Sequence, residues 1–106
     1  MDETQFATLA DAALDRIEVA LEECDVDADV ERKEGGVIEL EFADGGRMII
    51  NRHGAAREIW VAARSGGFHF RWDGTAWRDT RDGGELFAAL SRLVSAQSGQ
   101  PVLLKP

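Results

Sequence analysis

Apolar residues recur every three or four positions over the first quarter of the chain, which is the spacing of one face of an α-helix. These positions are Phe6, Leu9, Ala10, Ala13, Ile17, Ala20, Leu21 and Cys24. A second stripe of the same helix, well away from the apolar one, carries carboxylates at Asp11, Asp15, Glu18 and Glu22. The pattern therefore predicts an amphipathic helix over residues 6–24 with a solvent-facing row of acids.

The middle of the chain alternates apolar and polar residues with period two, which is typical of half-buried β-strands. Turn-forming residues such as Asp44-Gly45-Gly46 and Asp73-Gly74 separate the runs. The predicted strands lie within residues 25–31, 37–42, 47–51, 58–63, 68–72 and 76–78. This arrangement predicts an antiparallel meander of five or six strands.

A second amphipathic helix follows the strands. Asp82 and Glu85 are spaced like a capping box, and Gly99 and Pro101 supply a stop signal. The apolar positions between them are Leu86, Phe87, Leu90, Leu93 and Val94. We therefore expect one α+β domain over residues 1–106, a two-layer α-β sandwich. Its N- and C-terminal helices would pack on one face of a five- to six-stranded antiparallel sheet.

The net charge of -8 is distributed unevenly over the 106 residues. Residues 1–31 hold eleven acids and one base, whereas the remaining residues hold nine acids and eleven bases. The acidic end should attract cations or a basic protein surface and repel nucleic acid. No apolar stretch approaches the roughly 20 residues that cross a bilayer. The single cysteine, Cys24, and the acidic start favour a reducing cytoplasm.

The acidic row is the first candidate for chemistry. Like charges four residues apart cost a helix about 0.2–0.5 kcal/mol per pair, so helix stability does not account for the row. Carboxylates suit hard cations such as Mg²⁺, Ca²⁺, Mn²⁺ and iron, and an exposed row would bind them weakly. The alternative interpretation is a solvated helix face that keeps the chain soluble.

No catalytic or structural-metal motif accompanies the row. The alternation Asp25-x-Asp27-x-Asp29 resembles a calcium loop, but Val30 and Gly36 stand where an EF-hand requires Gly and Glu. One cysteine and two histidines are too few for the usual zinc sites, and no Ser/His/Asp arrangement is visible. We therefore expect a protein that is not an enzyme.

The strand around Trp60 is the second candidate. Ile59 and Val61 share one face of this strand, whereas Trp60 shares the other with Ala62. If the helices cover the first face, Trp60 lies on the open face, where it would form a protein-binding hot spot. Polar and basic neighbours there would be Asn51, Arg52, His53, Arg57 and Arg64. The alternative is that Trp60 belongs to the core, because large aromatic side chains are mostly buried.

The order and spacing of these elements resemble the bacterial frataxin family. The matching stretches are Ile49-Ile50-Asn51-Arg52, Glu58-Ile59-Trp60-Val61-Ala62, Gly66-Gly67-Phe68-His69-Phe70 and Trp77. They lie between an acid-rich first helix and a Leu-rich last helix, and the resemblance runs from Phe6 to about Gly99. Ala55 and Glu58 stand where the family commonly has Pro and Gln.

The resemblance implies binding of ferrous and ferric iron and participation in iron–sulfur cluster assembly. The implied metal positions are Glu18, Glu22, Asp25, Asp27 and Asp29, with Asp11, Asp15, Glu23, Glu3 and Glu31 as outer members. Other divalent cations would compete for such weak sites. The implied partner is the cysteine desulfurase, whose basic surface would meet Glu18 and Glu22, and the cluster scaffold is a further candidate. We assign Asn51 and Trp60 to partner contact as well.

The leading hypothesis is a non-enzymatic iron-binding regulator or iron donor. We expect a monomer without metal and leave metal-driven oligomers open. The rival hypothesis is a metal-independent acidic module that occupies a basic surface of a partner. A third hypothesis, ferroxidase activity, requires a closely spaced metal pair that exposed helix residues hold poorly.

Overall fold

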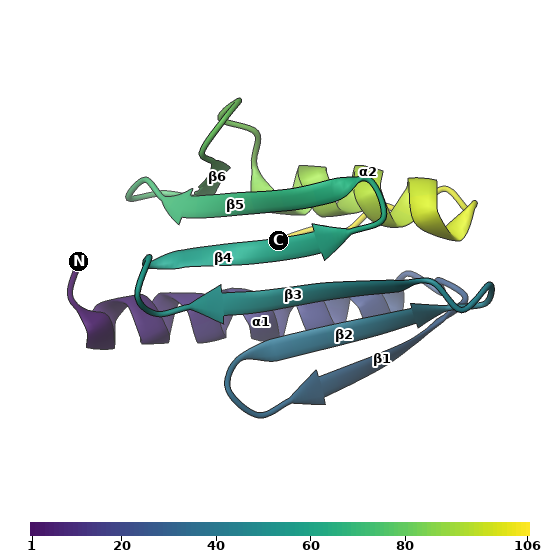
Figure 1. Cartoon of the computed structure of the whole chain (residues 1–106), viewed down its shortest axis with the longest axis horizontal. Coiled ribbons are helices and arrows are strands. Elements are labelled where there is room, and N and C mark those ends of the chain that lie inside the picture. Colours follow the sequence, from purple (N-terminus) through teal and green to yellow (C-terminus); the bar gives the residue numbers. More distant parts are fainter.

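Two helices cover one face of a single antiparallel sheet in the computed structural model, which describes all 106 residues (Figure 1). The elements are α1 (Glu3–Glu23), β1 (Ala28–Lys33), β2 (Val37–Phe42), β3 (Arg47–His53), β4 (Glu58–Ala63), β5 (Gly66–Trp72), β6 (Trp77–Asp79) and α2 (Leu86–Ser98). The strands follow one another in the sheet in chain order. The predicted α-β sandwich is confirmed, with six strands.

The first helix begins three residues earlier than its apolar pattern predicts, because a capping box fixes its start. The Asp2 side chain accepts the backbone N–H of Gln5, and the Gln5 side chain accepts the backbone N–H of Asp2. The buried face of α1 consists of Phe6, Ala10, Ala13, Leu14, Ile17 and Leu21. Leu14 widens the apolar stripe beyond the positions that the spacing indicates.

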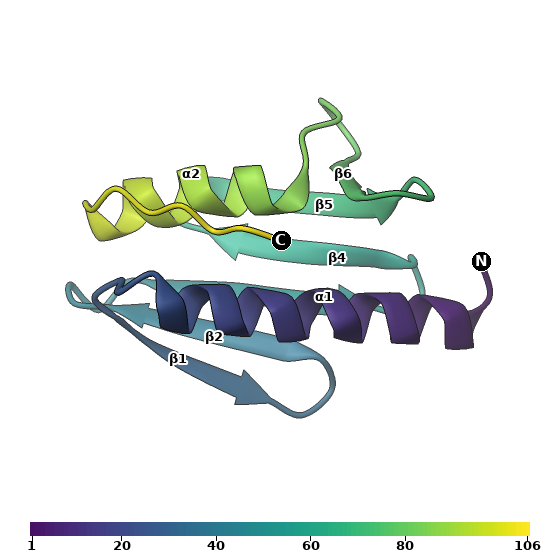
Figure 2. The same ribbon diagram turned by 180° about the vertical axis from the view of Figure 1, so that it is seen from behind.

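The two helices divide the covered face between them, with α1 in front of β1–β3 and α2 in front of β5 and beside β6 in the view of Figure 2. The alternation of each strand directs its apolar residues into this layer. The fully buried sheet residues are Ile38, Leu40, Met48, Ile50, Ile59, Val61 and Phe70. Trp60 lies on the opposite, open face and is partly exposed, so the alternative of a core Trp60 is wrong.

The second helix starts at a different cap from the one predicted. Glu85 is the N-cap and its side chain accepts the backbone N–H groups of Phe87 and Ala88. Asp82 instead accepts the N–H of Gly84 within the preceding turn, so the predicted capping box is wrong. Gly99 ends the helix in the left-handed conformation, at φ 75°, which glycine adopts without a side-chain penalty.

The last six residues return between the two helices (Figure 2). The Ser91 and Ser95 hydroxyls accept the backbone N–H groups of Leu104 and Val102. The Leu104 side chain is only 3% exposed and belongs to the core. The tail therefore closes the helix layer.

Neither helix combines the length and the hydrophobicity that a bilayer-spanning segment requires.

Candidate functional site

The predicted acidic residues lie along the outer side of α1, in the connection to β1 and, for Asp29 and Glu31, on β1 itself. None of them is buried, and Glu22, Glu23, Asp25, Asp27 and Asp29 are exposed. The row faces away from the apolar stripe because its members lie at helical spacing on the other side of α1. The structure therefore presents the whole predicted set of carboxylates to solvent, but it places them in two different electrostatic settings.

The upstream half of the row is paired with two arginines from the sheet. Arg32 of β1 donates from Nη1 to Asp15 Oδ1 at 2.9 Å and to Glu18 Oε1 at 3.1 Å. Arg52 of β3 donates from Nη1 to both carboxylate oxygens of Asp11 at 2.7 Å. These three acids therefore already have protein counter-ions.

Partial burial lowers the pKa of Arg32, but its hydrogen bonds and charge interactions with Asp15 and Glu18 outweigh that effect and raise the pKa above its ordinary value.

The prediction that Arg52 lies on the open face of the sheet is wrong. Arg52 follows Met48 and Ile50 with period two, so its side chain points to the helix side of the sheet.

The downstream half of the acidic region has no ion pairs. Glu22, Asp25, Asp27 and Asp29 line an open hollow between the end of α1 and the start of β1, which we call the carboxylate hollow. The chain turns sharply there, with Asp25 at φ 57°. The Asp27 N–H donates to Gln100 Oε1 at 2.8 Å, which ties this turn to the end of α2.

The carboxylates do not form a preassembled metal centre. No three His, Cys, Asp or Glu side chains converge closely enough to hold a metal ion. The oxygen donors of the carboxylate hollow suit a hard cation, and water would complete most of its coordination shell. Such a surface can hold a cation only loosely and can release it readily.

The open face of the sheet holds an aromatic arrangement that sequence reasoning missed. Trp60 is sandwiched between His53 and His69, with ring centroids 3.7 Å and 4.4 Å away and planes inclined by 10° and 11°. Asn51 and His69 are the register partners of Trp60 on either side. We call the rings of His53, Trp60 and His69 the ring stack. Alternation places all three on one face, but only the strand register brings them together.

A buried carboxylate anchors the ring stack. Glu58 is 5% exposed and accepts the Trp60 indole N–H at 2.9 Å and an Arg71 guanidinium N–H at 2.6 Å. Burial raises the pKa of Glu58, but the hydrogen bonds from Trp60 and Arg71 and the nearby positive charge outweigh it and lower the pKa below its ordinary value. Glu58 is therefore an ionised acceptor that fixes the indole orientation.

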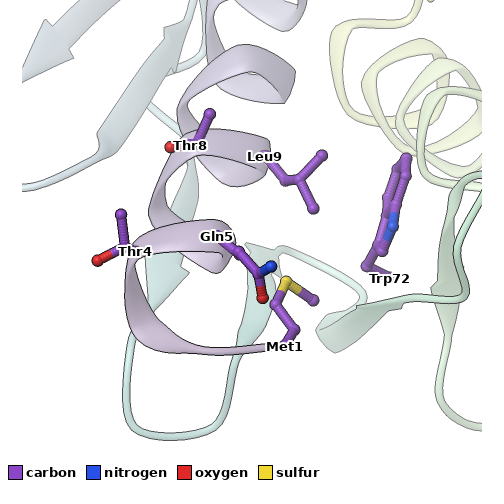
Figure 3. Close-up of a pocket in the computed structure, with 6 residues that line it drawn as sticks. All are labelled: Met1, Thr4, Gln5, Thr8, Leu9 and Trp72. Carbon is purple, nitrogen blue, oxygen red and sulfur yellow. The ribbon is translucent and has the colours of Figure 1, made fainter.

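An apolar hollow lies between the first turns of α1 and the end of β5 (Figure 3). The side chains of Leu9 and Trp72 face each other across it. Its lining side chains carry no charge: Met1, Thr4, Gln5, Thr8, Leu9 and Trp72. It offers mostly apolar packing surface, with the Thr4 and Thr8 hydroxyls and the Gln5 amide among its polar side-chain groups.

The two-layer sandwich, the acid-rich first helix and the central tryptophan on the open sheet face define a frataxin-like protein. The model of the frataxin-like domain matches residues 1–100 of this chain. The chain belongs to the bacterial frataxin family, the CyaY proteins.

Curated relatives match over nearly the full length. The iron–sulfur cluster assembly protein CyaY of Dechloromonas aromatica is 58% identical over 99% of this chain and 100% of its own length. The protein of the same name from Cupriavidus metallidurans is 51% identical over 99% of this chain and 97% of its own length.

Solved structures share the fold. Frataxin from Psychromonas ingrahamii aligns with a TM-score of 0.90 at 30% identity and covers 100% of both chains. A trimeric frataxin from the yeast Saccharomyces cerevisiae, complexed with ferrous iron, aligns with a TM-score of 0.72 at 31% identity over 86% of each chain.

Proposed function

We propose that this chain is a non-enzymatic iron-binding protein that regulates iron–sulfur cluster assembly or supplies iron to it, together with the cysteine desulfurase. The observation that carries the proposal is the unpaired state of the carboxylates at Glu22, Asp25, Asp27 and Asp29. The names of the curated relatives and the ferrous complex of the yeast frataxin support it.

Iron is the cargo in this proposal. The carboxylate hollow holds Fe²⁺ or Fe³⁺ weakly through carboxylate oxygens and water, and other divalent cations compete. Glu18, Asp15 and Asp11 join only when their arginines move aside, and Glu23 contributes long-range charge. Weak binding suits delivery or sensing, because a tightly held ion would not exchange with a partner. A reducing cytoplasm, which keeps iron ferrous and Cys24 free, is the proposed setting.

Two surfaces serve partner binding in this proposal. The acidic side of α1, with Glu18 and Glu22, meets a basic surface of the desulfurase through charge attraction. The open sheet face, with Asn51 and Trp60, contacts a second partner such as the cluster scaffold, because a partly exposed tryptophan in a polar surround is typical of interface hot spots. The chain is a monomer without metal in this proposal, and the trimeric yeast frataxins support the formation of oligomers.

A titration with ferrous iron under anaerobic conditions, followed by ¹⁵N NMR, tests the metal assignment. Paramagnetic broadening should centre on residues 22–29 and should weaken when Mg²⁺ is added. The variant Glu22→Gln/Asp25→Asn should reduce the broadening severalfold, because two of the four unpaired carboxylates of the hollow are lost. Asparagine is chosen at Asp25 because it tolerates the left-handed backbone there.

The charge-matched control is Glu34→Gln/Asp82→Asn, which removes two exposed acids from other turns. It should leave the broadening of residues 22–29 unchanged. Equal broadening in the wild type and in the Glu22→Gln/Asp25→Asn variant would contradict the metal assignment.

The second candidate function is a metal-independent acidic module. It is favoured by the lack of any three converging metal ligands and by the arginine pairing of Asp11, Asp15 and Glu18. Desulfurase binding measured by calorimetry with iron and with a chelator separates the two functions. Equal affinity in both conditions would favour the metal-independent module.

A further inference from the structure

The turn between α1 and β1, which carries the carboxylate hollow, receives one hydrogen bond from a distant part of the chain. The Asp27 N–H donates to Gln100 Oε1 at 2.8 Å, across 73 positions. Inside the turn the Ala28 N–H donates to the Val26 carbonyl at 2.9 Å, and Val26 packs against the core. The side chain of Gln100 is therefore the one polar group that holds this turn from outside.

Gln100 is itself held in place from both sides. It follows α2, which ends at the same end of the molecule as α1 (Figure 2). Its backbone N–H donates to Ser98 Oγ at 3.2 Å, and the next anchored residue, Val102, donates its N–H to Ser95 Oγ at 2.8 Å. Beyond them the Leu104 side chain is part of the core. Gln100 thus presents an acceptor oxygen from a fixed segment of backbone.

The position of this turn matters for cation binding because its carboxylates lack counter-ions. Asp25, Asp27 and Asp29 repel one another, and this repulsion favours a more open turn. The bond to Gln100 opposes such opening at the central residue of the three. Ligands that are already in place lose less conformational freedom when the cation arrives, so they bind it more tightly.

We propose that Gln100 is a positioning residue of the carboxylate hollow. By accepting the Asp27 N–H, it holds the carboxylates of the turn where they can share one hydrated hard cation. The proposal rests on the proposed function, because it takes the carboxylate hollow as the iron site. It adds a link between that site and the C-terminal tail, since the docked tail is what fixes Gln100.

Gln100→Met tests the role, because methionine keeps the length of the side chain and replaces the acceptor oxygen by a weakly accepting thioether. In the anaerobic Fe²⁺ titration followed by ¹⁵N NMR, the apparent affinity should fall roughly two- to fivefold. This is part of the roughly two- to tenfold effect that one hydrogen bond has on an equilibrium. The broadening of residues 27–29 should also weaken relative to that of Glu22, because Glu22 lies on α1 and does not depend on Gln100.

Gln97→Met is the matched control on α2. The Gln97 side chain also joins α2 to distant backbone, accepting the Arg64 N–H at 3.1 Å and donating to the Arg47 carbonyl at 2.9 Å. This variant should keep the Fe²⁺ affinity and the broadening pattern of the wild type. Urea denaturation of both variants measures the general loss of stability, which a purely structural role of Gln100 would share with Gln97.

Gln100→Glu is the rescue variant, because its carboxylate keeps an acceptor oxygen at the same reach. It should restore the amide proton shift of Asp27 and the relative broadening of residues 27–29. An added charge without the hydrogen bond would raise the affinity but would not restore this pattern.

Two results would overturn the positioning role: wild-type affinity and pattern in Gln100→Met, or an equal loss of affinity in Gln97→Met. The proposed function fails by a different measurement, namely absent broadening of residues 22–29 in the wild type or unchanged broadening in Glu22→Gln/Asp25→Asn. Failure there would overturn both. If Glu22→Gln/Asp25→Asn weakens the broadening and Gln100→Met does not, the positioning role alone is overturned.

Discussion

Arg52 on β3 donates from one terminal nitrogen to both carboxylate oxygens of Asp11 on α1, each at 2.7 Å. The two residues are 41 positions apart in the chain, so the pair joins the first helix to the middle of the sheet. It also removes one carboxylate from the acidic row. A structural contact thus limits which acids remain available to a cation or a partner.

Breaking this pair should cost little stability, because both side chains are partly exposed and water screens them. Arg52→Gln and Asp11→Asn should each lower the free energy of unfolding, with a coupling energy of about 0.2–1 kcal/mol. A double-mutant cycle from urea denaturation measures this coupling. A coupling of zero would show that solvent screens the pair completely.

Removing Arg32 should extend the cation-binding region. Arg32→Gln leaves Asp15 and Glu18 without a counter-ion, so iron-induced NMR broadening should spread from residues 22–29 back to these two acids. The apparent affinity for Fe²⁺ should rise roughly two- to fivefold, since one competing positive charge is lost. Arg16→Gln is the control, because Arg16 lies on α1 with Asp15 and Glu18 but makes no ion pair. Identical titrations of the two variants would contradict competition by Arg32.

The C-terminal tail should contribute strongly to stability through one side chain. Leu104→Ala removes a 3% exposed core residue and should lower the free energy of unfolding by about 2–4 kcal/mol. The neighbouring Leu103 is 68% exposed, so Leu103→Ala should change the free energy of unfolding by less than about 0.5 kcal/mol. Thermal and urea denaturation of both variants measure the difference. Equal stability of the two would mean that the tail does not pack between the helices.

Glu58 should make the protein acid-sensitive. Because the pKa of Glu58 is lower in the folded than in the unfolded state, its contribution to stability is complete above the unfolded value near 4.5. That contribution is lost as the pH falls through the lower folded value. Glu58→Gln should therefore destabilise the protein at neutral pH, by roughly 1–3 kcal/mol, and flatten the loss of stability below pH 4.5.

Urea denaturation between pH 3 and 7 measures this dependence, with the exposed turn variant Glu34→Gln as control. The control should follow the wild-type curve. If Glu58→Gln lost stability below pH 4.5 as steeply as the wild type, the titrating group would lie elsewhere. One example is Asp73, whose pKa the backbone N–H groups of Ala76 and Thr75 also lower.

Local patterns in the sequence determined the helices, the strands and the faces they present. The three-and-four spacing from Phe6 to Cys24 located α1 and its exposed acids, since residues on one helix are related by fixed geometry. Period-two alternation put Ile59 and Val61 on one face of their strand and Trp60 on the other, and the structure shows that the face of Ile59 and Val61 is the buried one. The frataxin resemblance followed from the order and spacing of the motifs between an acid-rich first helix and a Leu-rich last helix.

Only the tertiary structure decided which of these residues meet. Arg32 and Arg52 reach the acidic row because α1 packs across β1 and β3, and no local pattern encodes that docking. The stacking of His69 on Trp60 depends on strand register, which the turns and the whole buried face set together. Spacing along one element is a local property of the chain, whereas pairing between elements is a cooperative result of packing the entire core.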